Sequence, residues 1–181
     1  MLSDGALTLR AWTVADADAL AARIDGDAAV AAFLDQIPQP YTRDDALAYL
    51  THCEESWRSG ANSNFALLVE GIEQPVGSIG VHWREKIDDG VAELGYWIAE
   101  VARGRGATTA AARLTARWAF AAEPELERLQ LRADVENAAS NRVAEKAGFV
   151  REGVLRSAHW NARVGRRVDF VMWSLLRSEP A

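Results

Sequence analysis

Six residues, Arg103-Gly104-Arg105-Gly106-Ala107-Thr108, lie between an apolar segment at 91–98 and an alanine-rich segment at 107–122. The first segment is typical of a strand and the second of a helix, so the two glycines fall in a strand-to-helix turn. A glycine-rich turn that opens a helix directs several backbone N–H groups to one point, which suits a phosphate group. Arginines at 103 and 105 add positive charge beside the turn. The stretch therefore predicts an anion site.

Two glycines alone are also compatible with an ordinary turn. The dinucleotide-binding fingerprint is excluded because no third glycine follows at its spacing, and a P-loop is excluded because no Gly-Lys-Ser/Thr follows. A second segment, Val135-Glu136-Asn137-Ala138-Ala139-Ser140, brings polar side chains to another predicted strand-to-helix junction, and Ala147-Gly148-Phe149 follows it. We expect the two junctions to form one site.

The rest of the chain alternates between strand and helix patterns, which indicates an α/β protein with a mixed sheet and three layers. Thr42 is a predicted N-cap and Gly60 a predicted helix end. Strands are predicted at 7–12, 64–69, 76–83, 91–98, 128–135, 149–155 and 167–176. Helices are predicted at 14–24, with Thr13 as the N-cap, and at 28–34, 43–59, 107–122 and 138–147.

Composition limits the class of protein. The 181 residues are 49% hydrophobic, which is enough for a core, and we expect one domain, 1–181. No apolar run is long enough to span a membrane and no basic-then-apolar leader is present, so we expect a cytoplasmic protein. The only cysteine, Cys53, excludes an internal disulfide framework, and three scattered histidines show no metal-ligand spacing, so no metal is expected.

Charge is unevenly distributed along the chain. Residues 1–100 carry 17 acidic and 6 basic side chains, whereas residues 101–181 carry 9 acidic and 14 basic side chains. A basic second half suits a polyanionic ligand, and an acidic first half can attract a cationic one, although ordinary solvated surface explains both equally well. Nucleic acid is not an expected partner, because the formal net charge is −6 and no basic run occurs.

Together these segments resemble the GNAT N-acetyltransferase superfamily. The stretch at 103–108 is similar to its pyrophosphate loop, Gln/Arg-x-x-Gly-x-Gly/Ala, except that Thr108 stands where Gly or Ala is usual. Asn137-x-x-Ser140, the run Glu-Lys-Ala-Gly-Phe at 145–149 and the run Glu-Leu-Gly-Tyr-Trp-Ile at 93–98 resemble the ribosomal-protein N-acetyltransferase subgroup (RimJ/RimL-type). The resemblance runs in order from about residue 7 to residue 177.

This resemblance implies the GNAT fold: a mostly antiparallel seven-stranded sheet, splayed between its fourth and fifth strands, with helices on both faces. Acetyl-CoA would be the acyl donor, with its pantetheine arm in the splay and its pyrophosphate on the glycine turn. The cofactor-binding residues implied by this placement are Tyr96, Trp97, Ile98, Arg103, Gly104, Arg105, Gly106, Ala107, Thr108, Thr109, Asn137 and Ser140.

Two residues are candidate catalytic groups. In the subgroup, the serine at the position of Ser140 is the candidate that protonates the leaving thiolate, whereas many superfamily members use a tyrosine where this chain has Ala144. Ser140 is alternatively only the third residue of a helix capped by Asn137. Glu93 can hold a water that takes the proton from the amine, or it can simply pair with an arginine across the sheet. His82 and His159 are rival bases.

The reaction implied is transfer of an acetyl group from acetyl-CoA to a primary amine, foremost a protein or peptide N-terminal amine, by direct attack on the thioester. Two alternatives stay open: an enzyme for small amines such as polyamines or antibiotics, and a non-catalytic acyl-CoA-binding domain. Acyl chain length and the identity of the base are open too. The protein is expected to be a monomer or a homodimer.

Overall fold

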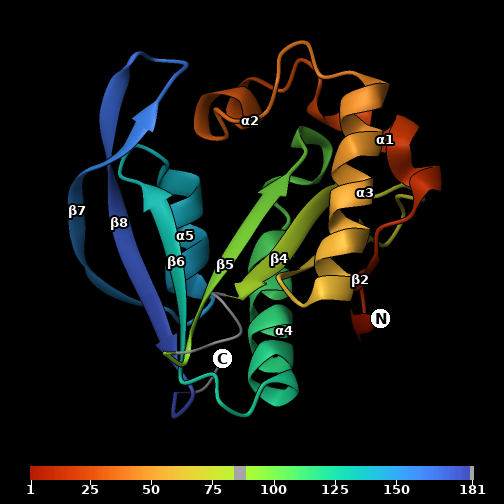
Figure 1. Ribbon diagram of the computed structural model, residues 1–181. Helices are drawn as coiled ribbons and strands as arrows, with labels where there is room; N and C mark the ends of the chain where they lie inside the picture. The colour runs from red at the N-terminus through yellow and green to blue at the C-terminus, as the bar shows by residue number, and fades with distance from the viewer. Residues whose placement is uncertain (84–88, 180–181) are drawn as a thin grey trace.

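The computed structural model describes residues 1–83 and 89–179, and Figure 1 shows its elements. The strands are β1 (Leu2–Asp4), β2 (Leu7–Ala11), β3 (Asn62–Val69), β4 (Gly77–Trp83), β5 (Val91–Ile98), β6 (Arg128–Asp134), β7 (Val150–Asn161) and β8 (Arg166–Leu176). The α-helices are α1 (Ala17–Ile24), α2 (Ala28–Phe33), α3 (Arg43–Ser59), α4 (Ala107–Ala122) and α5 (Ala138–Lys146), and 3₁₀ turns are η1 (Val14–Asp16) and η3 (Glu100–Ala102). No described helix is long and apolar enough to cross a bilayer.

The strands form one sheet in the order β1-β2-β3-β4-β5-β6-β8-β7, and every neighbouring pair except β5–β6 is antiparallel. The expected mixed, mostly antiparallel sheet is confirmed, but the expected count of seven strands is wrong. The additional strand is β1, which pairs with β2 through Leu2–Leu9 and Asp4–Leu7. A segment of three residues, two of them polar, is too short to show the alternation that indicates a strand.

The predicted splay lies between β5 and β6. These strands pair only through Val91–Arg128, Ala92–Leu129 and Glu93–Gln130. Beyond that point β5 stays with β4 and β6 stays with β8, so the sheet opens as a V toward α2 (Figure 1). The facing edges of the two strands therefore keep backbone N–H and C=O groups that the other strand does not use.

Helices cover both faces of the sheet, as predicted. On one face, α1 and α3 form a core with Trp12 and Ala66. On the other, α4 and α5 pack on the strands through alanines, and Ala111, Ala112, Ala116 and Ala119 of α4 are all fully buried. Because alanine side chains are short, the α4 backbone lies close to the sheet.

Capping residues and a terminal glycine set the ends of a helix at the positions that the sequence predicts, whereas other elements differ from the prediction. Helix α3 spans 43–59 as predicted, with the Thr42 side chain accepting from the N–H of Asp45 at 3.2 Å and Gly60 ending it at φ 76°. The helix predicted after Thr13 begins with the 3₁₀ turn η1, of which Thr13 is the N-cap as predicted, and continues as α1. The hairpin of β7 and β8 is longer than predicted, because β7 continues to Asn161 through two irregularities in pairing that hide its period.

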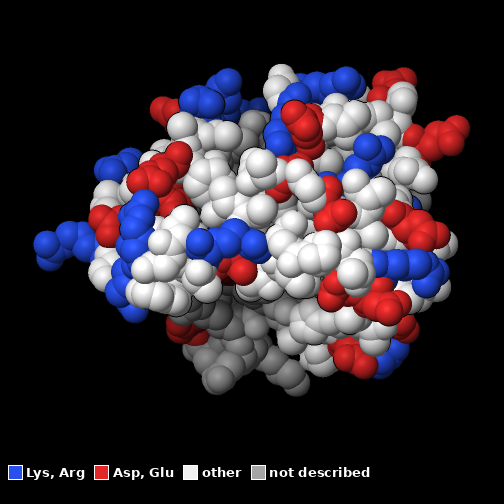
Figure 2. All heavy atoms as spheres, turned by 90° about the horizontal axis from the view of Figure 1, so that it is seen from above, with Lys and Arg blue, Asp and Glu red and all other residues white. Residues whose placement is uncertain are grey.

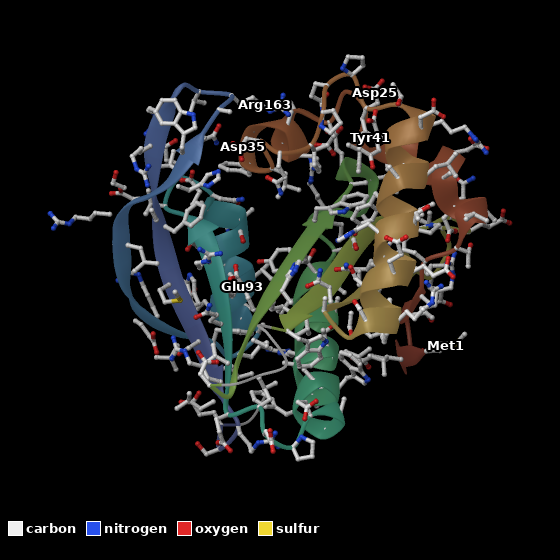
Figure 3. All side chains as sticks on the ribbon, in the orientation of Figure 1. Met1, Asp25, Asp35, Tyr41, Glu93 and Arg163 are labelled. Atoms are coloured by element: carbon white, nitrogen blue, oxygen red, sulfur yellow. The ribbon has the colours of Figure 1, made fainter. Side chains whose placement is uncertain are left out.

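The tip of this hairpin reaches across to the segment after α2. His159 Nε2 lies 2.9 Å from Asp35 Oδ1, and the N–H of Ala162 donates to Asp35 Oδ2 at 2.9 Å. Arg163 donates to the carbonyl of Ile37. Figure 3 shows Asp35 and Arg163 near one another above the V. Segment 28–37 therefore forms a strap over the open end of the sheet.

Candidate active site

A cavity of about 460 Å³ fills the open part of the V between β5 and β6, and we call it the groove cavity. Its walls come from the strap, the end of β5, the beginnings of α4 and α5, and β6. Of the predicted cofactor-binding residues, all but one line it: Tyr96, Trp97, Ile98, Arg103, Gly104, Gly106, Ala107, Thr108, Thr109, Asn137 and Ser140. Arg105 does not line it.

The beginning of α4 has the backbone expected of an anion site. Gly104 and Gly106 have φ of 74° and 77°, in the left-handed region that favours glycine, and Gly106 occupies the N-cap position. No side chain caps α4, whereas Asp27, Thr42 and Asn137 cap α2, α3 and α5. Residues 107–109 of the first α4 turn line the groove cavity, and no side chain among the described residues accepts from their N–H groups. Thr108, buried in this turn, lines the cavity as well.

Arg103 faces the strap. Its guanidinium lies 2.6 Å from both carboxylate oxygens of Asp27, and its Nε donates to the carbonyl of Ile98 at 3.1 Å. Burial acts to raise the pKa of Asp27, but the Arg103 guanidinium and the N–H groups of Val30 and Ala29 outweigh it and hold that pKa below its usual range. Because Asp27 also caps α2, this ion pair ties the strap to the glycine turn.

Ser140 lies on the groove cavity beside a tyrosine from β5. The hydroxyl oxygens of Tyr96 and Ser140 are 2.8 Å apart, and the Tyr96 hydroxyl also lies 3.2 Å from the Ser140 carbonyl oxygen. Burial raises the pKa of Tyr96 to about 12, so its hydroxyl stays protonated near neutral pH. The sequence prediction used only the backbone of Tyr96 and missed this side-chain contact, which joins residues 44 positions apart.

Asn137 has the capping role that was one of the sequence alternatives. Its Oδ1 accepts from the N–H of Ser140 at 3.0 Å. The sequence missed Asn141, whose amide group donates to the carbonyls of Asp134 and Asn137 and accepts from the indole N–H of Trp173. These contacts fix the first turn of α5, and with it the position of Ser140.

Glu93 lies low in the V, where β5 and β6 are still paired (Figure 3). Its carboxylate is 3.0 Å from Nε and 2.9 Å from a terminal nitrogen of Arg132. This ion pair across the sheet is the alternative that the sequence left open for Glu93. Glu93 does not line the groove cavity, although Arg132 does.

A second cavity, of about 430 Å³, lies on the other side of the end of β5, and we call it the acceptor-side cavity. It shares Leu34, Tyr96 and Trp97 with the groove cavity, so the two adjoin there. Polar groups from α3, β3 and β4 line it, among them Tyr49, whose hydroxyl is 3.0 Å from Ser78 Oγ. Its remaining residues are Ile24, Gln36, Ile37, Pro38, Tyr41, Asp45, Ala48, His52, Asn64, His82 and Gly95.

No metal-binding site is evident in the described part of the chain. Among residues 1–83 and 89–179, no group of three or more His, Cys, Asp or Glu side chains is arranged to hold an ion. Cys53 is buried and free. Besides hydroxyls, histidines and backbone N–H groups, charged side chains line the two cavities, among them Asp45 in one and Arg132 and Asp134 in the other.

Residues 6–150 match the family described as Acetyltransferase (GNAT) domain. The chain is 39% identical over 103 residues to the Bacillus subtilis protein named "Putative ribosomal N-acetyltransferase YdaF", a segment covering 57% of this chain and 54% of that one. It is 36% identical over 69 residues to the Escherichia coli ribosomal-protein-serine acetyltransferase, covering 38% of each.

One solved structure, named "Probable acetyltransferase", is similar along nearly its whole length. It superimposes with a TM-score of 0.83 at 30% identity, covering 97% of this chain and 96% of the other. The curated relatives match over shorter segments, since the chain spans about half the length of the Bacillus subtilis protein.

Proposed function

The chain belongs to the GNAT acetyltransferase family, and from that premise we propose that it is an N-acetyltransferase that moves an acetyl group from acetyl-CoA to a primary amine. The observation that carries the proposal is the groove cavity, in which the uncapped beginning of α4, the edge of β5 that β6 does not pair with, and the Ser140 hydroxyl face one space. These three features suit three parts of acetyl-CoA. The N–H groups of α4 suit a phosphate, the strand edge suits the amides of the pantetheine arm, and the hydroxyl suits the thioester.

The donor would lie along this cavity in a fixed direction. The N–H groups of the first α4 turn, together with Gly104 and Gly106, suit the pyrophosphate. The edge of β5 from Leu94 to Ile98 can pair with the pantetheine amides as an added strand would. The thioester would then lie near Tyr96 and Ser140, where the groove cavity meets the acceptor-side cavity.

Once the donor is bound, acetyl transfer requires three further contributions from the protein. A backbone N–H of β5, that of Ile98 in our assignment, stabilises the charge that develops on the thioester oxygen. Ser140 Oγ–H donates a proton to the departing sulfur, and the Tyr96 hydroxyl, 2.8 Å from Ser140 Oγ, can afterwards replace that proton. A base must take a proton from the amine, because free amines are mostly protonated near neutral pH. Direct attack suffices, since the thioester is already activated.

The acceptor we propose is the N-terminal amine of a protein, such as a ribosomal protein. The names of the Bacillus subtilis and Escherichia coli relatives support this class of acceptor. An acceptor of this kind would place the reaction in the cytoplasm. The acceptor-side cavity, at about 430 Å³, is large enough for one N-terminal residue and its neighbour, or for a small amine.

The test is thiol release from acetyl-CoA with three acceptors in parallel: a short peptide that begins with serine, spermidine and kanamycin. The products are identified by mass spectrometry. Acetylation of the peptide at its amino end is the expected result, and preference for spermidine or kanamycin would replace the protein acceptor with a small amine. Tight binding of acetyl-CoA without thiol release for any amine would contradict the enzymatic proposal in favour of an acyl-CoA-binding domain. Cys53 does not interfere with the thiol readout, because it is buried.

A further inference from the structure

His82 lies on β4 at the acceptor-side cavity, and a neighbouring side chain fixes which of its ring nitrogens carries the proton. Its Nδ1 is 2.9 Å from Asn62 Oδ1 on β3. An amide oxygen only accepts hydrogen bonds, so Nδ1 is the N–H of the neutral ring. The other nitrogen, Nε2, then holds the lone pair that a base needs.

The lone pair lies beside the part of β5 that separates the two cavities. A Cβ atom built on Gly95 would stand 3.4 Å from His82 Nε2, so the ring extends over Gly95. Gly95 directly precedes Tyr96 and Trp97, the pair that lines both cavities. The absence of a side chain at Gly95 leaves room for the ring and for an amine beside it.

The groups around His82 keep its imidazole ring neutral. Burial lowers the pKa of His82 below its usual range and outweighs the opposing attraction of Glu93, which is its register partner on β5. His52 on α3 and Arg132 on β6 lower it further. Asn62 on β3 adds no charge. By accessible surface His82 is an exposed residue, so a proton taken up at Nε2 can pass to solvent.

We propose that His82 is the base that accepts a proton from the acceptor amine, and that Asn62 positions it. Glu93 is less well placed for this role, because it is held by Arg132 and lines neither cavity. The inference rests on the proposed function and adds to it a residue that acts on the acceptor.

The proton balance is as follows. His82 Nε2 removes one proton from the substrate ammonium group, and the neutral amine then attacks the thioester carbon. The C–N bond forms and the C–S bond breaks. The sulfur receives the Ser140 proton, and the nitrogen's second proton returns to Ser140 through the Tyr96 hydroxyl, which lies 2.8 Å from Ser140 Oγ. His82 releases its proton to solvent, which leaves the amide, CoA thiol and one free proton.

The experiment compares His82→Gln with His159→Gln, using acetyl-CoA and the peptide that begins with serine. His159 is the matched control, because it is a histidine that lines neither cavity and glutamine can still donate to Asp35. We expect His82→Gln to lower kcat at least about 100-fold, the usual size of a general-base effect, with little change in the KM for acetyl-CoA. His159→Gln should stay within about threefold of the wild type.

Three further variants give readouts that a structural role would not move. Asn62→Asp puts a carboxylate on Nδ1, so the acid limb of the kcat–pH profile should shift to higher pH. Glu93→Gln removes the attraction that raises the pKa of His82, so that limb should shift to lower pH. Imidazole in the buffer should restore part of the activity of His82→Ala.

The outcomes separate this inference from the proposed function. Circular dichroism first confirms that each variant is folded. A folded His82→Gln that keeps kcat within about threefold, or a Glu93→Gln that loses it 100-fold, overturns the role of His82 while the acetyltransferase stands. A wild-type protein that acetylates no amine overturns both.

Discussion

Ser140 is the residue on which the proposed chemistry depends most directly. We expect Ser140→Ala to lower kcat by about 10²–10⁴-fold and to change CoA affinity little, because a proton donor to the leaving sulfur acts in the transition state. Tyr96→Phe should reproduce part of the loss, since it removes the hydroxyl 2.8 Å from Ser140 Oγ. Steady-state kinetics and CoA titration measure the two effects. Turnover within about twofold of the wild type in both variants would leave Ser140 as a helix residue that Asn137 caps.

Gly106 tests the anion site at the beginning of α4. Valine at φ 77° is strained, so Gly106→Val should move the first-turn N–H groups and raise the CoA dissociation constant at least about tenfold, roughly 1.4 kcal/mol. Gly60→Val is the matched control, because Gly60 ends α3 at φ 76° with similar open space around it and lines neither cavity. Isothermal titration should show weaker binding only for Gly106→Val. Equal CoA affinities in the two folded variants would mean that the phosphate binds at another place on the protein.

The residues also show which parts of the site the sequence can predict. The turn conformations of Gly104 and Gly106 and the capping contact of Asn137 were predictable, because they depend on the backbone within a few positions. The contact of Tyr96 with Ser140 was not, because it forms only when β5 and α5 are brought together by the sheet. For Glu93 the sequence offered two roles, and the partner that the structure gives it, Arg132, lies 39 positions away.

At the scale of elements, the strap is tied at both ends by acidic residues. Asp27→Ala removes the cap of α2 and the ion pair with Arg103 together, whereas Asp27→Asn keeps an oxygen for the cap and loses the charge. We expect faster hydrogen exchange in residues 28–37 for both variants and a larger effect for alanine, with a cap contribution of about 1 kcal/mol. Exchange rates equal to those of the wild type would mean that the hairpin tip alone holds the strap.

Elements with strong end signals were predictable, and those shaped by distant partners were not. Helix α3 has Thr42 and Gly60 at its ends, and β5 and α4 have continuous apolar or alanine-rich patterns, so their predicted bounds agree with the structure. Strand β1 forms only because β2 offers an edge to pair with. The outer part of β7 has no regular alternation of buried and exposed residues and is shifted in register, so its length follows from β8 rather than from its own pattern.

At the scale of the molecule, charge is less separated in space than along the chain. Figure 2 shows the face over the V, with Lys and Arg interspersed among Asp and Glu and no broad field of either sign. The acidic surplus of residues 1–100 therefore does not gather on this face. Acceptor choice should depend more on the lining of the acceptor-side cavity than on long-range attraction.

We propose that residues 1–181 form one domain, since eight strands make one sheet, and we expect one thermal unfolding transition. Its pH dependence should include Glu152, whose pKa is lowered to about 2 by Arg128, at 2.6 Å from each oxygen, and by Ser174. A carboxyl with a lowered folded pKa contributes stability above its unfolded pKa of about 4.5, and that contribution is lost as the pH falls toward 2.

Glu152→Gln isolates this contribution from those of the other carboxyl groups. The variant should melt below the wild type at pH 7, and the difference in Tm should narrow between about pH 4.5 and 2. Calorimetry over this range measures both. A difference that stays constant with pH would mean that the carboxylate charge adds nothing to stability.

The two cavities meet at Tyr96 and Trp97 but are encoded in different parts of the chain. Every residue of the acceptor-side cavity lies between positions 24 and 97, whereas the groove cavity, apart from the strap and Phe170, is built from positions 96–146. Recombination near position 90 would therefore exchange most of the acceptor-side lining together with the strap, and would keep the β6, α4 and α5 walls of the groove cavity. A lineage built this way would acquire new acceptors far more readily than new donors.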